Sequence, residues 1–135
     1  MTTYESKITT VFKPQSEVFE QLSDLRNLEK FRTQIPEQYD FTCEEDFVSV
    51  KNTPFGNAVL RIIERECPKT LKFTLENMPI QANLWVQLKE TAPSDTKLKI
   101  TIKAEIPFFL KPMIAKKLEE GINTMAETLA FALNK

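Results

Sequence analysis

Residues 114–135 read IAKKLEEGINTMAETLAFALNK and form a long amphipathic run at the end of the chain. At about 100° per residue on a helical wheel, the large apolar side chains share one stripe: Ile114, Leu118, Ile122, Met125 and Leu129. Small residues lie along its margins: Ala115, Gly121, Ala126 and Ala132. Only Phe131 points to the polar side. This pattern predicts a helix gripped by a concave sheet, whose strands approach the small residues at its flanks.

Alternation of apolar and polar residues predicts the strands of that sheet. We expect strands over Tyr4–Phe12, Phe41–Glu44, Phe47–Lys51, Ala58–Cys67, Leu71–Glu76, Leu84–Lys89 and Lys97–Ala104. Two short helices are expected after the first strand, one starting at Pro14 and one over Asn27–Thr33, with a break at Ser23-Asp24. Short polar links favour an antiparallel meander. The fold class is therefore α+β, with a curved seven-stranded antiparallel sheet wrapped round the C-terminal helix.

The composition indicates one domain over residues 1–135, because 135 residues are enough for one packed core. The net charge of -1 argues against nucleic acid as a partner, since phosphate binding needs a concentrated cationic surface. The first residues lack the order of a signal peptide, and no apolar run reaches about 18 residues. We therefore expect a cytoplasmic protein without integral membrane association. Its oligomeric state is not indicated.

The residue types limit the available chemistry. The chain contains no histidine, which removes the usual general base and the commonest metal ligand. Cys43 and Cys67 lack metal-site spacing and have no histidine to activate them, so inert thiols are expected. We predict no metal and no cofactor, and we assign no catalytic residue.

Three stretches resemble the helix-grip fold of the SRPBCC superfamily, which groups START, Bet v 1 and polyketide cyclase-like domains. They are FKPQSEVFEQLSDLRNLEKF (12–31), NLWVQLKETAPSDTKLKITIKAEI (83–106) and KKLEEGINTMAETLAFAL (116–133), the last similar to the terminal helix of small bacterial members. The resemblance covers nearly the whole chain. It implies a deep, mostly apolar cavity between sheet and helix, but no single chemistry: members bind lipids, hormones or polyketides, and some assist cyclisation or act on partner proteins.

The inward phase of the strands and helix gives the residues expected to line such a cavity. They are Leu71, Phe73, Leu84, Val86, Leu98, Ile100, Ile114, Leu118, Ile122 and Met125. Tyr4 and Tyr39 are candidates for a hydroxyl inside it.

The loops differ between the two ends of the predicted meander. One end has polar turns, whereas the other pairs proline with large apolar residues, and Ile35-Pro36 joins it if the family topology holds. The candidate mouth residues at that end are Phe55, Met78, Ile80, Phe108 and Phe109. Three interpretations remain open: a cavity mouth, a plug that caps the core, or an exposed patch that meets a membrane or a protein.

Charged residues supply few candidates for polar contacts in the cavity. The run Leu60–Glu64 breaks strict alternation, so a bulge there could turn Arg61 or Glu64 inward. The simpler interpretation is a charged outer face. Lys97, Lys99 and Lys103 are expected on that convex face. Trp85 falls in the same polar phase of its strand, and a slip in register would turn it inward instead.

The function indicated by these observations is binding of a small apolar or amphipathic ligand, similar to a lipid or a polyketide, between the sheet and the C-terminal helix. One alternative is an enzyme of the cyclase or hydratase kind, which requires an inward, partnered ionisable group. The other is a module that contacts a protein or a membrane through the apolar end.

Overall fold

The computed structural model describes residues 2–34, 40–53, 56–78 and 80–134. Its strands are β1 (Thr2–Glu5), β2 (Thr9–Val11), β3 (Phe41–Cys43), β4 (Phe47–Thr53), β5 (Gly56–Glu66), β6 (Thr70–Glu76), β7 (Gln81–Ala92) and β8 (Asp95–Glu105). Its helices are α1 (Gln15–Ser23), the 3₁₀ helix η1 (Leu25–Gln34) and α2 (Lys111–Leu133). Ile35, Pro36, Tyr39 and Phe55, named above as candidates, lie outside the described residues.

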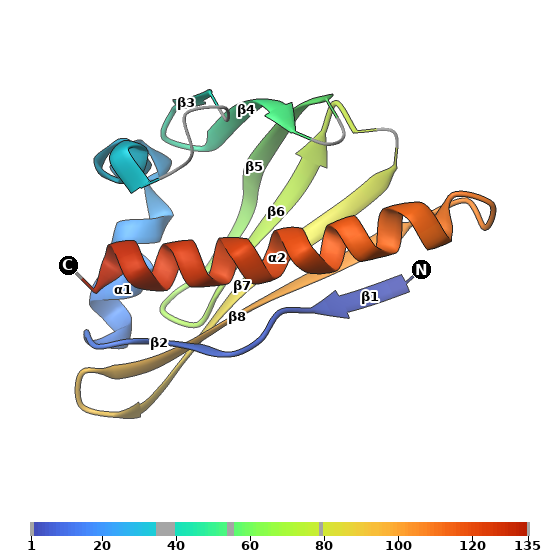
Figure 1. Ribbon diagram of the computed structural model, residues 1–135. Helices are drawn as coiled ribbons and strands as arrows, with labels where there is room; N and C mark the ends of the chain where they lie inside the picture. The colour runs from blue at the N-terminus through green and yellow to red at the C-terminus, as the bar shows by residue number, and fades with distance from the viewer. Residues whose placement is uncertain (1, 35–39, 54–55, 79, 135) are drawn as a thin grey trace.

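The strands form one antiparallel sheet with the order β1-β8-β7-β6-β5-β4-β3, and β2 also pairs with β8. Figure 1 shows this curved sheet with α2 lying across its concave side. The predicted α+β helix-grip architecture is therefore present. The meander places the β4–β5, β6–β7 and β8–α2 connections at one end of the sheet, and the turns between β3 and β4, β5 and β6, and β7 and β8 at the other.

The N-terminal strand is broken in two, unlike the single strand predicted over Tyr4–Phe12. At the break, the Ser6 backbone N–H donates to the Ile100 carbonyl at 2.7 Å, and the Ser6 hydroxyl accepts from the Ile100 N–H at 2.8 Å. A side-chain oxygen thus replaces a backbone carbonyl in the ladder. The Lys7 N–H turns away from the sheet and donates to Asn123 Oδ1 on α2 at 2.7 Å.

The break between the two N-terminal helices lies at Asp24, as predicted. Helix α1 begins at Gln15, and the extended backbone of Pro14 (φ -60°, ψ 145°) makes it the N-cap instead of the predicted first helical residue. At the other end, the Asp24 carboxylate accepts a hydrogen bond from the Arg26 guanidinium at 2.6 Å. This hydrogen bond lowers the pKa of the Asp24 carboxyl below its ordinary value.

A register shift between Ile62 and Glu64 marks the bulge predicted in β5. Ile62 lies before the shift and is buried, whereas Glu64 is exposed. After the shift, Arg65 stands opposite the fully buried Leu71, which puts it on the inner side of the sheet. Its guanidinium donates to the Ser23 carbonyl at the end of α1 at 2.8 Å, where a positive charge is favourable.

Helix α2 is rotated relative to the predicted wheel. Its buried residues are Ile114, Leu118, Ile122, Ala126, Ala130, Ala132 and Leu133. Met125 and Leu129, which we predicted to be central, are only partly buried. The reason is that α2 packs chiefly against β8, β2 and β1, and alanines let it approach these strands closely. Phe131 is exposed, as predicted.

Asparagine side chains fasten α2 to the N-terminal segment. Besides the contact of Asn123 with Lys7, Asn134 Oδ1 accepts from the Phe12 N–H at 2.6 Å, and Asn134 Nδ2 donates to the Thr10 carbonyl at 3.0 Å. The helix is therefore held against one edge of the sheet at two points about three turns apart.

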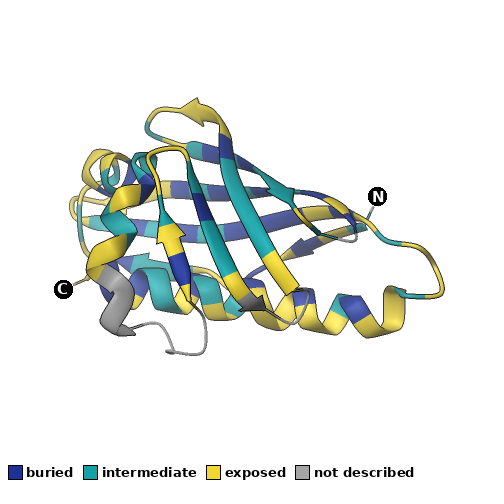
Figure 2. Ribbon diagram, turned by 90° about the horizontal axis from the view of Figure 1, so that it is seen from above, coloured by how far each residue is buried: buried dark blue, intermediate teal, exposed yellow. Residues whose placement is uncertain are grey.

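The packed part of the core lies along β8, and Figure 2 shows buried positions alternating along the strands. We expect Leu98→Ala to lower the free energy of unfolding by about 2–5 kcal/mol, because Leu98 is fully buried and its truncation leaves a cavity. Urea denaturation would measure the loss. The matched control is Lys99→Ala on the outer face, which removes only a partly exposed ion pair with Glu5 and should cost less than about 1 kcal/mol. Equal losses for the two variants would contradict this assignment of the core.

Candidate functional site

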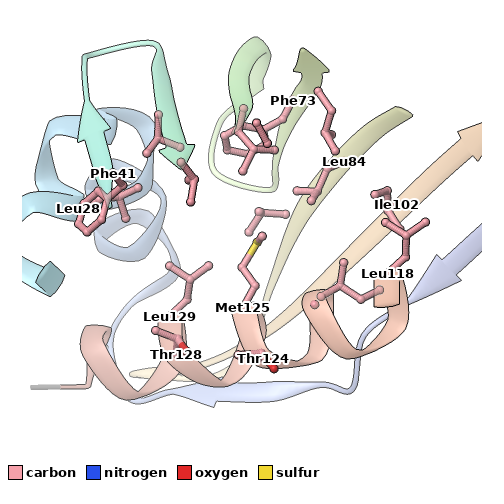
Figure 3. Close-up of a pocket in the computed structure, with 18 of the residues that line it drawn as sticks. Leu28, Phe41, Phe73, Leu84, Ile102, Leu118, Thr124, Met125, Thr128 and Leu129 are labelled. Carbon is pink, nitrogen blue, oxygen red and sulfur yellow. The ribbon is translucent and has the colours of Figure 1, made fainter. Parts of the chain in front are cut away.

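A pocket of about 550 Å³ lies between α2 and the half of the sheet that α2 does not cover. Figure 3 shows Phe41, Phe73 and Leu84 on the sheet side, and Met125 and Leu129 on the helix side. The residues that line it are Leu22, Leu25, Leu28, Phe41, Val48, Val50, Ala58, Leu60, Phe73, Leu75, Met78, Leu84, Val86, Ile102, Lys117, Leu118, Glu120, Gly121, Ile122, Thr124, Met125, Thr128 and Leu129. This volume is typical of small-molecule sites and far exceeds the space of a single water.

The pocket exists because the sheet curves away from the helix. Near α2, strands β8, β2 and β1 are in direct contact with it. Farther across the sheet, β4, β5 and β6 face α2 across the open space, which α1, η1 and β3 close at one end (Figures 1 and 3). The turn at Leu25 is tied to this end by a hydrogen bond from its N–H to the Glu45 carbonyl at 3.0 Å.

The walls of the pocket differ in polarity. Every lining residue from the sheet, α1 and η1 among those described is apolar. The polar side chains all come from α2: Lys117, Glu120, Thr124 and Thr128. The first three are exposed, so they mark the edge at which the pocket reaches the protein surface. An occupant would meet apolar walls inside and polar groups along this one edge.

The sequence-predicted lining residues fall into two groups. Six of them border the pocket: Phe73, Leu84, Val86, Leu118, Ile122 and Met125. The other four, Leu71, Leu98, Ile100 and Ile114, are buried but do not border it. Leu98 and Ile100 lie on the part of β8 that is packed beneath α2, whereas Ile102, farther along the same strand, borders the pocket. Leu71 begins β6 near the end that α1 closes, where Gln15 Nε2 donates to the Pro68 and Leu88 carbonyls at 3.0 and 3.2 Å.

The residues that sequence reasoning missed come from two regions: the far side of the sheet with α1 and η1, and the flank of α2 that carries Lys117, Glu120, Thr124 and Thr128. Val48 and Val50 share one phase of β4, and Ala58 and Leu60 share one phase of β5, so alternation was available as a signal. Alternation does not predict the curvature of the sheet, which brings these strands opposite α2. Leu28 on η1 carries no sequence signal of this kind.

The predicted mouth residues do not act together. Met78 lines the pocket, whereas Ile80 is buried and does not border it. Phe108 and Phe109 are 88% and 73% exposed, and neither touches the pocket. Phe55 lies outside the described residues. The apolar end is thus a pocket wall at Met78, core at Ile80 and exposed surface at Phe108 and Phe109.

Arg61 and Glu64 do not border the pocket. Arg61 Nε donates to Glu76 Oε1 at 2.8 Å, and its guanidinium lies 4.7 Å from the centre of the Phe47 ring. Both contacts lie on the outer face, because Arg61 precedes the bulge and is out of phase with buried Ile62. The bulge turns Arg65 inward instead, at the end of the sheet closed by α1.

The convex face carries the charges expected of it. The Lys72 and Lys103 ammonium groups lie 5.4 Å and 5.6 Å from the Trp85 ring, an arrangement that favours cation–π attraction. Lys97 and Lys99 pair with acidic neighbours at 3.1 Å and 3.3 Å. Trp85 therefore belongs to the outer surface and takes no part in the pocket.

Tyr4 and the two cysteines, Cys43 and Cys67, lie apart from the pocket. Tyr4 is buried, and its hydroxyl has no hydrogen-bond partner among the described residues, but Tyr4 does not border the pocket. Within the described ranges, no three Cys, Asp or Glu side chains gather as a metal site would require. No disulfide joins Cys43 and Cys67.

Solved structures with the same architecture identify the fold. Norcoclaurine synthase from Thalictrum flavum, a point mutant in complex with a transition-state analogue, superposes with a TM-score of 0.76 at 10% identity, covering 98% of this chain and 94% of that one. A START superfamily protein from Mycobacterium smegmatis gives 0.64 at 12% identity, covering 98% and 94%. The chain therefore has the helix-grip fold.

Other structures with the helix-grip fold include the Aha1 dimer from Colwellia psychrerythraea, with a TM-score of 0.64 at 15% identity over 100% of this chain and 99% of that one. No family model and no curated protein sequence matches the chain. At these identities the likeness extends to the fold alone.

Gly121 borders the pocket and makes no close contact with a strand. A Cβ built at Gly121 meets no atom within 4 Å, and its backbone is helical. We expect Gly121→Ala to raise the free energy of unfolding by about 0.5–1 kcal/mol, because alanine has the higher helix propensity. Urea denaturation would measure the gain. As a control, Gly56→Ala also has space, but its φ of +92° should make the variant less stable than the wild type. A destabilised Gly121→Ala variant would contradict the open space beside this residue.

Proposed function

We propose that the protein binds a small amphipathic molecule, with the apolar part in the pocket and the polar part at the α2 edge. The observation that carries this proposal is the distribution of polarity around a 550 Å³ pocket. Burying apolar ligand surface against Phe41, Phe73 and Leu84 supplies a favourable and non-directional term. The hydroxyls of Thr124 and Thr128 suit a polar group that stays near water.

The comparisons support binding as a use of this architecture. A second norcoclaurine synthase structure from Thalictrum flavum, in complex with dopamine and hydroxybenzaldehyde, superposes with a TM-score of 0.75 at 8% identity, covering 96% of this chain and 84% of that one. Its small aromatic ligands are of the size that pockets of a few hundred Å³ accept.

An enzymatic function has less support. General acid–base catalysis needs an ionisable group within hydrogen-bond reach of the reacting atoms. Among the described residues, the ionisable groups on the pocket are Lys117 and Glu120, and both stand at its exposed edge. Binding without chemical conversion is therefore the function that the geometry favours.

The proposal extends to partner and compartment. The ligand is a small hydrophobic or amphipathic molecule and not a nucleic acid, because Lys and Arg are balanced by Asp and Glu, with a net charge of -1. A cytoplasmic location is in keeping with the exposed, unpaired thiol of Cys67. Among the described residues, no helix is long and apolar enough to span a bilayer.

A pair of tryptophan variants on β5 tests the pocket directly. Ala58 lines the pocket, whereas the next residue, Val59, is on the opposite face of the same strand. We expect Ala58→Trp to weaken binding of anilinonaphthalene sulfonate, an amphipathic fluorescent probe, by about tenfold or more, because the indole occupies the pocket. Val59→Trp should change the affinity by less than about twofold. Fluorescence titration gives both values, and circular dichroism checks that each variant is folded.

Equal affinities for the two folded variants would contradict binding in the pocket. Native mass spectrometry of protein purified from its own source would supply the ligand, as a mass that co-purifies with wild type and is reduced in Ala58→Trp.

A further inference from the structure

Three exposed apolar residues lie close together in the sequence where the chain enters α2. Phe108, Phe109 and Met113 are 88%, 73% and 61% exposed, and we call them the Phe108 patch. Phe108 and Phe109 lie on the β8–α2 connection, which extends from one end of the molecule as an exposed loop (Figure 2), and Met113 lies in the first turn of α2. Apolar residues gathered on a protruding loop mark a contact surface, because water is an unfavourable neighbour for them.

The loop is held in this exposed position by its own backbone and by the core. The Leu110 N–H donates to the Pro107 carbonyl at 2.9 Å, and the Ile114 N–H donates to the Leu110 carbonyl at 3.0 Å. Leu110 packs against the core, and Ile114 is buried. With these residues on the inner side, the phenyl rings of Phe108 and Phe109 are directed outward.

The charges around the patch are positive. Lys111, Lys116 and Lys117 are exposed, and none forms an ion pair within the part of the chain that the structure describes. From residue 106 to residue 118 the sequence contains no acidic residue. The nearest carboxylates in sequence, Glu105 and Glu119, lie outside this segment. An exposed apolar segment with three lysines as its neighbours in sequence matches an anionic surface with an apolar interior.

The patch also adjoins the pocket. Met113 and Lys117 are four residues apart on α2, so they are neighbours on one helix face. Lys117 lines the pocket, and the same face continues through Gly121, Thr124 and Thr128 along the pocket edge. A surface bound at the Phe108 patch would therefore lie at one end of that edge.

We propose that the Phe108 patch is a membrane-contact site that inserts into the headgroup region of a bilayer containing anionic phospholipid. Three side chains are too few for a stable protein interface, which buries about 800 Å² on each partner, but aromatic rings flanked by lysines are enough for reversible interfacial binding. Membrane contact through the Phe108 patch does not depend on the proposed ligand. Transfer of an apolar ligand between bilayer and pocket along the α2 edge does rest on the proposed function.

Vesicle sedimentation tests the site. The wild type should bind phosphatidylcholine vesicles that contain phosphatidylserine, bind pure phosphatidylcholine more weakly, and lose affinity as salt is raised. The double variant Phe108→Ser, Phe109→Ser should bind the anionic vesicles about tenfold or more weakly. The matched control is Phe131→Ser, which removes a phenyl ring of 61% exposure from the other end of α2 and should change binding by less than about twofold.

Several results would overturn the proposal. They are failure of the wild type to bind anionic vesicles, an equal loss in Phe131→Ser, and a concentration-dependent dimer in sedimentation velocity that the double variant abolishes. The last would assign the patch to a second copy of the chain. The Ala58→Trp variant separates the two proposals, because Ala58 lines the pocket and is not part of the Phe108 patch. This variant should keep the wild-type binding to anionic vesicles, so a loss confined to the double variant supports the membrane site.

Discussion

The attachment of α2 to one side of the sheet is the constraint on which the rest of the structure depends. Buried Ala126 and Ala130 bring the helix close to β2 and β8, and Asn123 and Asn134 fasten it to the N-terminal segment. A straight helix cannot follow a curved sheet across its full width. The more firmly it packs against β8, the more of the inner face of β4, β5 and β6 it leaves uncovered. The pocket is this uncovered area, closed at one end by α1 and η1.

The same arrangement explains why the polar groups of the pocket are all on one element. The inner face of a half-buried sheet is apolar, because alternate residues face the core. A helix changes more gradually from core face to solvent face, so its flank brings Lys117, Thr124 and Thr128 to the pocket edge. Such a site selects its occupant chiefly by shape and apolar area, and only its edge can distinguish one polar group from another.

Much of the fold was predictable because the periodicity is clear. Alternation gives β6, β7 and β8, and the wheel of residues 114–135 gives α2. The broken N-terminal strand was not predictable, because it depends on the Ser6 hydroxyl bonding to Ile100 across the sheet. The bulge in β5 was visible in Leu60–Glu64, but only the register with β6 reveals that Arg65, and not Arg61 or Glu64, takes the inner phase.

The pocket was harder to predict, because alternation identifies the face of a strand and not what covers it. Leu84 and Leu98 have the same pattern on neighbouring strands, yet Leu84 borders the pocket and Leu98 is packed. The difference is the position along the strands: Leu84 stands opposite Ile102, which also borders the pocket, whereas Leu98 stands opposite Leu88, which is packed as well. In the same way, the helical wheel cannot show that Ala126 is more buried than Met125. That order follows from how closely the helix approaches the sheet.

The join between the N-terminal segment and α2 also limits the order in which the molecule can be built. Among the described strands, β1 and β2 pair only with β8, about 90 to 100 residues later, and the side chain of Asn134 is bonded to Thr10 and Phe12. Contacts of such sequence separation form late and slow the folding of a chain. On the ribosome, β1 and β2 have no strand to pair with until β8 has been synthesised. The central strands can pair with their neighbours as they emerge, so the edge that holds α2 is the last part of the sheet to close.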